Sequence, residues 1–270
     1  MINKKYLKNL RCKEINSKND FIFDLYNDKI IDSLEIINLN FKKILILGDH
    51  GTKLRKFINK KYINTSVTLY DLKNNNFDLD EWQYKCNENE YDLIISNFYL
   101  FLSDDFNNIL KKIITSLTPN GFFIATLPTR ENFNSLKFSM IKTDVDFYGG
   151  AYNRFNQFMD LSKIIELLKT NNFKIPLINL ENINLEYKKF NNLLNDIRSM
   201  NLSYYSKDKK KIFEKKMYFK KLEKNYKKDL NNNFVISTNF YIISGWKNHE
   251  SQQKPLRPGE AKNKLKDFLK

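Results

Sequence analysis

A glycine-containing turn directly after a short apolar run is the part of this sequence with the clearest chemical use. The run of residues 42–47 ends at Gly48, and Gly51 follows shortly before a helix-like segment that begins at Lys53. Glycine lets the backbone approach a ligand closely, and a helix that begins after such a turn presents unpaired N–H groups to it. The pattern predicts the first strand and the ligand loop of a Rossmann-like domain.

A carboxylate at the end of the next predicted strand extends this pattern. Residues 67–71 form a strand-like run that ends in Asp71, about 20 residues after the glycine turn. In Rossmann-type domains a carboxylate at this place accepts hydrogen bonds from ribose hydroxyls. We therefore expect Asp71 to bind a ribose.

The other candidates lie at strand ends and in a later aromatic loop. The expected cofactor ligands are Gly48, Asp49, Gly51, Asp71, Leu72, Ser96 and Asn97. The candidates for contact with the reacting group are Tyr99, Tyr152 and Arg154. Each tyrosine has the alternative role of an aromatic side chain at the rim of the site.

The chain has only two histidines, His50 and His249. An iron site of two histidines and one carboxylate would need both of them, and they meet only if the C-terminal tail folds over the ligand loop. We therefore expect no metal site. Cys12 and Cys86 form no ligand-spaced pair, which indicates free thiols in a reducing cytoplasm.

Apolar strands that alternate with helical patterns predict a parallel sheet with right-handed crossovers, an α/β fold. We expect strands at residues 42–47, 67–71, 91–97, 122–127, 173–180 and 234–246, with a further short strand within 74–90 and a turn at 118–121. Helices are expected at 53–59, 104–116, 160–170 and 207–228, whereas the pattern loosens over 129–156. The predicted domains are an N-terminal helical cap (1–40), a Rossmann-like cofactor-binding core (41–185), a helical insertion (186–230), a last strand that completes the core sheet (231–247) and a basic tail (248–270).

The composition limits the classes of partner. The 270 residues carry a formal net charge of +15, but the lysines are spread along the whole chain, so we expect no dedicated nucleic-acid site. No apolar run reaches the roughly 18 residues of a membrane span, and the N-terminus has no signal-peptide pattern. These features predict a cytoplasmic protein and leave peripheral membrane association open.

The order of strand, glycine loop, acid-tipped strand, Tyr91-Asp92-Leu93-Ile94-Ile95-Ser96 and Leu117-Thr118-Pro119-Asn120-Gly121 resembles class I S-adenosylmethionine-dependent methyltransferases. The segment from Gly245-Trp246-Lys247-Asn248-His249 to Gly259 is similar to the C-terminal signature of one subgroup. That subgroup contains the mitochondrial complex I assembly factor that hydroxylates an arginine, together with bacterial relatives named after a methyltransferase of biotin synthesis. Gly149-Gly150 with Arg154-Phe155, and Asp196-Ile197-Arg198-Ser199-Met200, also match this subgroup.

The resemblance implies a seven-stranded, mostly parallel Rossmann-like sheet with a helical segment inserted before the last strand. It also implies S-adenosyl-L-methionine as cofactor and a protein substrate, with an iron–sulfur subunit of respiratory complex I as a candidate. The expected function is methyl transfer to a protein partner in complex I (NADH dehydrogenase) assembly. The alternatives are arginine hydroxylation of a complex I subunit, O-methylation of a malonyl carrier protein, and a non-catalytic assembly scaffold.

Overall fold

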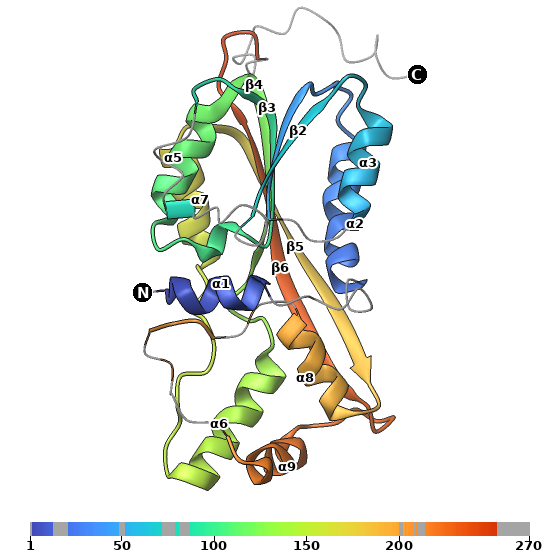
Figure 1. The fold of residues 1–270 in the computed structure, drawn as a ribbon, viewed down its shortest axis with the longest axis vertical. Helices are drawn as coiled ribbons and strands as arrows, with labels where there is room; N and C mark the ends of the chain where they lie inside the picture. The colour runs from blue at the N-terminus through green and yellow to red at the C-terminus, as the bar shows by residue number, and fades with distance from the viewer. Residues whose placement is uncertain are drawn as a thin grey trace, which may run out of the picture.

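Six strands form one sheet in the computed structural model, in the order β2-β1-β3-β4-β6-β5 (Figure 1). The structure describes residues 2–12, 21–48, 52–71, 79–80, 87–199, 202, 204–207, 209 and 214–252. The strands are β1 (Lys43–Leu47), β2 (Ser66–Tyr70), β3 (Tyr91–Asn97), β4 (Leu117–Pro128), β5 (Phe173–Tyr187) and β6 (Phe234–Lys247).

The sheet is mostly parallel, as the sequence predicted. β1 pairs in parallel with β2 and with β3, and β3 pairs in parallel with β4. Only β6 runs the other way, since it is antiparallel to both of its neighbours. The part of the chain described has six of the seven strands that the resemblance implied. Most of residues 74–90, where a further strand was predicted, lie outside that part.

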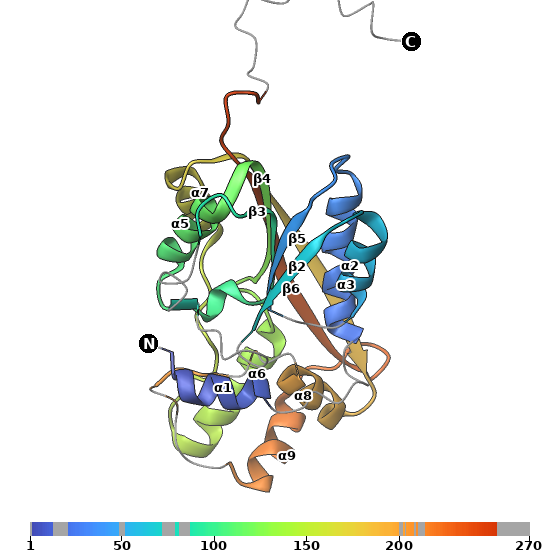
Figure 2. The same ribbon diagram turned by 45° about the horizontal axis from the view of Figure 1, so that its top comes forward.

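Helices cover both faces of the sheet and also lie beyond one end of its strands (Figures 1 and 2). Helices α2 and α3 lie on one face, and α5 and α7 lie on the other. Beyond the carboxyl ends of the parallel strands lie α6, α8 and α9, beside the long β5–β6 hairpin. The helices are α1 (Lys4–Cys12), α2 (Phe21–Glu35), α3 (Lys53–Lys61), the short 3-10 helix η3 (Leu100–Leu102), α5 (Phe106–Ser116), α6 (Asn134–Tyr148), α7 (Leu161–Thr170), α8 (Phe190–Ser199) and α9 (Lys216–Asn225).

The apolar strands build a separate core on each face of the sheet, because successive side chains point to opposite faces. In β3, Leu93 and Ile95 pack toward α2 and α3. Ile94, between them, packs toward α5 and α7. Both cores are closed by helices whose apolar stripes the sequence displays at helical spacing. At the start of α5, the Asp105 side chain accepts a hydrogen bond from Asn108 N at 3.0 Å, so this aspartate caps the helix.

The structure corrects three predictions of secondary structure. Helix α6 forms where the pattern had loosened, and α9 begins only at Lys216 instead of near residue 207. The predicted turn at 118–121 is part of β4. The pairing of β3 with β4 is irregular at this segment. Tyr91 pairs with Leu117 while Leu93 pairs with Phe122, so β4 has extra residues between the two pairs, and Asn120 among them has a φ of 61°.

Candidate functional site

The carboxyl ends of β1 and β2 bring Gly48 and Asp71 side by side. Leu47 pairs with Tyr70 in the ladder, and Gly48 N donates a hydrogen bond to Tyr70 O at 2.9 Å. Gly48 has a φ of +87°, a conformation that favours glycine. Asp71 is completely buried beside it. Asp49, Gly51 and Leu72, which were also predicted to bind cofactor, lie outside the described residues.

The end of β3 contributes Ser96 and Asn97 to the same edge, on opposite faces of the sheet. Asn97 is bound by the protein at both ends of its amide, because its Nδ2 donates to Asn27 Oδ1 at 2.7 Å and its Oδ1 accepts from Thr126 Oγ1 at 2.8 Å. These bonds leave one N–H and one lone pair of the Asn97 amide. Ser96 Oγ, in contrast, is buried and has no hydrogen-bond partner among the described residues, so its full hydrogen-bonding capacity is left for a ligand.

Tyr99 lies in the core and not at the rim of the site. Its ring is completely buried. A Cβ atom placed on Gly48 would come within 2.8 Å of Tyr99 Cβ and 2.9 Å of Asn97 O. The glycine is thus required partly because β1 and the β3–η3 connection approach each other closely. The structure does not bring Tyr99 together with Tyr152 and Arg154, which belong to a separate cluster.

The residues at this edge fit an adenosine-type cofactor in the chemistry of their donors and acceptors. A carboxylate next to a glycine turn suits ribose hydroxyls, and the buried Ser96 hydroxyl has no hydrogen-bond partner within the described part of the chain. Asn97 can add one further hydrogen bond at each end of its amide while it keeps its bonds to Asn27 and Thr126. Gly48, Asp71, Ser96 and Asn97 are therefore the described residues suited to hold such a group.

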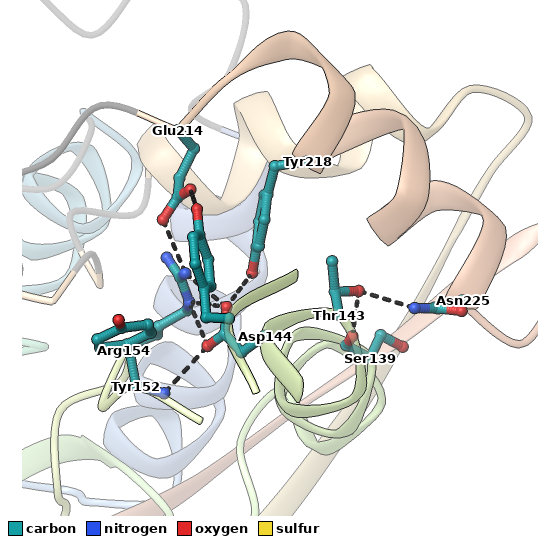
Figure 3. A network of polar contacts seen from close by, with 9 residues as sticks. Ser139, Thr143, Asp144, Tyr152, Arg154, Glu214, Tyr218 and Asn225 are labelled. Carbon is teal, nitrogen blue, oxygen red and sulfur yellow. Dashed lines mark hydrogen bonds and ion pairs between the residues drawn. The ribbon is translucent and has the colours of Figure 1, made fainter. Parts of the chain in front are cut away.

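A second polar cluster joins α6, the loop after it and the segment before α9 (Figure 3). Arg154 Nε lies 2.8 Å from Asp144 Oδ2, and Arg154 Nη2 lies 2.7 Å from Glu214 Oε1. Tyr218 Oη donates to Asp144 Oδ1 at 2.9 Å, and the guanidinium lies 4.7 Å from the centre of the Tyr218 ring. Arg154 is therefore held between two carboxylates and an aromatic face.

The surroundings of Asp144 and Arg154 favour the ionised form of both side chains. Burial alone raises the pKa of Asp144, but hydrogen bonds from Arg154, from Tyr152 N–H and from Tyr218 outweigh it and hold that pKa below its ordinary value. Burial acts to lower the pKa of Arg154, and its two carboxylate partners more than offset this and raise it. Sequence reasoning missed Asp144, Glu214 and Tyr218. Only the predicted loop containing Arg154 pointed toward them.

An open pocket of about 740 Å³ lies next to this cluster. It contains Tyr152 and Arg154, which the sequence predicted at the mouth of a site, but not Gly48, Asp71, Ser96 or Asn97. Its walls come from the start and middle of α6, from residues 152–160 and from the start of α7. The candidate residues therefore form two groups, one at the strand ends and one at this pocket.

The C-terminal segment lies at the amino ends of the parallel strands, whereas Gly48 lies at their carboxyl ends. Trp246 pairs with Phe122, at the beginning of the apolar part of β4, and the two rings are 4.5 Å apart. His249 Nδ1 lies 3.3 Å from Asn120 Nδ2 and 2.8 Å from Ser251 Oγ. These contacts fix the described part of the tail at the amino ends of the parallel strands, far from Gly48 and Asp71. His50 lies outside the described residues, and a search of the described part of the chain finds no group of three or more potential metal ligands.

The sheet order, the single antiparallel strand and the helices on both faces define an α/β protein with a Rossmann-like fold of the class I methyltransferase type. A solved structure of a putative methyltransferase from Bacillus halodurans aligns with a TM-score of 0.45 at 9% identity, covering 82% of this chain and 98% of that one. Phosphoethanolamine N-methyltransferase 2 of Haemonchus contortus aligns with a TM-score of 0.44 at 17% identity, over 83% of this chain and 52% of that one.

The chain is similar in sequence to proteins named mitochondrial arginine-hydroxylase NDUFAF5. The one from Dictyostelium discoideum is 29% identical over 185 residues, which are 66% of this chain and 41% of that protein. The human one is 23% identical over 263 residues, which are 91% of this chain and 75% of that protein. The match thus spans about two fifths of the Dictyostelium relative's length and three quarters of the human relative's. These relatives belong to the subgroup whose signature the sequence resembles, and no family model matches the chain.

Proposed function

We propose that this protein modifies a protein partner during assembly of respiratory complex I, with S-adenosyl-L-methionine bound at the carboxyl edge of its parallel strands. The observation that carries the proposal is the similarity to relatives named arginine hydroxylases, which extends over 91% of this chain in the human case. The strand-end arrangement of Gly48, Asp71 and Ser96 supports a cofactor of this class. An iron–sulfur subunit of complex I is the proposed partner.

The proposed cofactor ligands are Gly48, Asp71, Ser96 and Asn97, together with Asp49, Gly51 and Leu72 from outside the described residues. When bound, the cofactor supplies an electrophilic methyl group, so the protein needs only to bind, orient and exclude water. Asp71 would accept hydrogen bonds from the ribose, and the Ser96 hydroxyl would bond a polar atom of the ligand. Because both side chains are buried, these hydrogen bonds would form away from bulk water.

Arginine hydroxylation is the second candidate reaction, because the relatives' printed name states it. It inserts one oxygen atom into a C–H bond of the arginine side chain. With O₂ as the oxygen source, the second oxygen atom leaves as water and a reductant supplies two electrons. Methyl transfer instead replaces one hydrogen by a methyl group and needs no electrons. The names of these relatives place them in mitochondria, whereas the compartment that we propose for this chain from its sequence is the cytoplasm.

The test is intact-protein mass spectrometry of purified complex I subunits from cells with and without this protein. We expect one subunit to gain the mass of one methylene group or of one oxygen atom only when the protein is present. Fragmentation then assigns the modified residue, with an arginine as the expected site. An unchanged mass for every subunit, combined with normal assembly of complex I, would overturn the proposal. An unchanged mass with failed assembly would identify a scaffold.

The cofactor is tested separately by calorimetric titration with S-adenosylmethionine. Asp71→Asn keeps the size of the side chain but weakens its hydrogen bonds to ribose hydroxyls, so binding should weaken by roughly tenfold, as expected for a charged hydrogen-bond acceptor. Asp160→Asn, an exposed carboxylate at the start of α7, is the matched control and should bind as the wild type does. Equal affinities for the wild type and Asp71→Asn would exclude Asp71 from the site.

A further inference from the structure

Helix α6 buries three polar residues together with Leu136 and shows an apolar side to solvent. Ser139, Thr143 and Asp144 are buried on the inner side. Phe138, Ile141 and Val145 are 69%, 47% and 51% exposed on the outer side. These three residues are three and four positions apart, so they form one row along the helix, which we call the α6 apolar row. Helices that cover a core normally have the reverse arrangement.

Specific contacts fix this orientation of the helix. Thr143 Oγ1 donates to Ser139 O at 2.7 Å and accepts from Asn225 Nδ2 of α9 at 3.1 Å (Figure 3). Asp144 is bound on the same inner side by Arg154 and Tyr218. Rotating the helix to bury the apolar row would expose Thr143 and break the Asp144–Arg154 pair. Exposure of the row is therefore built into the fold.

The α6 apolar row continues into the pocket described above. Ile141 belongs to both, and Met140 and Tyr152 extend the apolar lining. The same pocket contains cationic and anionic side chains, namely Arg130, Lys137 and Lys163 together with Glu131 and Asp160. On the helix, Lys137 and the exposed Lys142 lie on either side of the row. An exposed apolar patch with a polar border is the usual form of an interaction site.

We propose that the α6 apolar row and the adjoining pocket are the docking surface for the protein partner, which presents an apolar segment bordered by carboxylates. This inference rests on the proposed function, because it names where that partner binds. Lysines on both sides of the row favour acidic groups on the partner. A pocket with charges of both signs favours a polypeptide, whose side chains can match each charge, over the uniform surface of an anionic bilayer. The pocket contains Arg154 and begins where β4 leads into α6, beyond the carboxyl ends of the parallel strands. A docked segment would therefore lie on the side of the molecule where the cofactor is proposed.

The test uses site-specific photocrosslinking in cells that assemble complex I. Benzoylphenylalanine replaces Val145, and in a control protein it replaces Ile63, which is 72% exposed in the turn after α3. We expect Val145, and not Ile63, to crosslink to one complex I subunit, at a segment with apolar residues and aspartate or glutamate beside them. A synthetic peptide of that segment should then bind the full-length Ile141→Ser/Val145→Ser variant roughly tenfold more weakly than the wild type. Ile36→Ser/Ile63→Ser should bind the peptide as the wild type does, and circular dichroism checks that all variants fold.

Each other outcome overturns the docking proposal. Crosslinks from Val145 to a second copy of this chain would assign the row to a dimer. Binding to vesicles of phosphatidylcholine and phosphatidylglycerol that is lost in Ile141→Ser/Val145→Ser, without a peptide effect, would assign it to a membrane. Equal peptide affinities for the variant and the wild type, or an absence of crosslinks, would leave the row without a docking role. The proposed function and the docking surface can fail separately. A subunit that crosslinks to Val145 but never changes in mass would support the docking surface and exclude the modification. A subunit that is still fully modified in cells with the Ile141→Ser/Val145→Ser variant would support the modification and exclude the docking surface.

Discussion

Arg154 was predicted to contact the reacting group, and the structure gives it two carboxylate partners instead of an open position. Its side chain is 16% exposed, whereas Asp144 is fully buried. The net attraction within a buried salt bridge contributes little to stability. Removing one partner is costly because the other charge is then left buried without a partner. The cluster therefore joins α6 to the loop that contains Tyr152 and Arg154 and to the segment before α9. In this arrangement Arg154 acts as a positioning residue for the wall of the pocket.

Replacing Asp144 with asparagine should lower the free energy of unfolding by roughly 3 kcal/mol, because the guanidinium then loses a buried anionic partner. Urea unfolding followed by circular dichroism measures the change. The exposed pair between Arg130 and Asp160 offers a matched control, for which Asp160→Asn should cost less than about 1 kcal/mol. Equal losses for the two variants would show that burial of the Asp144 pair has no energetic consequence.

The lowered pKa of Asp144 also predicts a dependence of stability on pH. In the unfolded chain this carboxyl titrates near its ordinary value of about 3.9. Because its pKa is lower in the folded protein, the unfolded state binds more protons in that range, and stability falls as the pH falls through it. The stability difference between the wild type and Asp144→Asn should thus be constant above about pH 5 and shrink progressively below about pH 4. Urea titrations at several pH values measure it; a difference that grew on acidification would contradict the assigned sign.

The elements differ in how far the sequence could predict them. β3 was predicted with the bounds that the structure shows, since residues 91–97 are apolar on both faces and end at polar side chains. α6 was missed because apolar residues lie on both of its sides: Leu136 is buried among polar residues on the inner side, and Phe138, Ile141 and Val145 lie on the outer side. Its sequence therefore lacks the single apolar stripe that is typical of a helix packed on a core. The partners of Arg154 were equally hidden, because Asp144 and Glu214 lie on different elements.

The strand ends offer a matched pair of buried hydroxyls for a test of the cofactor edge. Ser96 Oγ has no hydrogen-bond partner in the described part of the chain, whereas Thr126 Oγ1 on neighbouring β4 bonds Asn97 Oδ1 at 2.8 Å and Phe98 N at 3.0 Å. Ser96→Ala should therefore leave the ligand-free protein about as stable as the wild type. Thr126→Val should cost about 1–3 kcal/mol, because it leaves buried polar groups unsatisfied. Urea unfolding of the two variants measures this contrast.

Cofactor binding should respond mainly to the serine. If the Ser96 hydroxyl bonds the ligand, Ser96→Ala should weaken binding of S-adenosylmethionine by roughly fivefold, the value of one neutral hydrogen bond. Titration calorimetry measures the affinity. A Ser96→Ala protein that is both unstable and unchanged in affinity would mean that this hydroxyl serves the fold and not the ligand.

On the scale of the whole molecule, the most specific sequence signature and the proposed ligand edge lie at opposite ends of the sheet. The Trp246 ring contacts the Phe122 ring at a tilt of 43°, and Lys247 Nζ donates hydrogen bonds to Leu117 O at 2.6 Å and Thr115 O at 3.1 Å. The described part of the signature thus joins the last strand to the end of α5 and the start of β4. A signature that indicates a function can therefore consist of residues that serve the fold.

This separation predicts that damage at Trp246 affects stability without affecting ligand affinity. Trp246→Ala removes a half-buried ring of β6 that contacts Phe122 of β4, so the free energy of unfolding should fall by about 2 kcal/mol. Trp246→Phe retains most of the ring contact with Phe122 and should lose less than half of that. Both variants should bind S-adenosylmethionine with wild-type affinity when titrated well below their melting temperatures, since the parallel strands hold Gly48, Asp71 and Ser96 in register at the far edge. A loss of affinity in Trp246→Ala beyond roughly tenfold, with the protein still folded by circular dichroism, would show that the two edges are energetically coupled through the sheet.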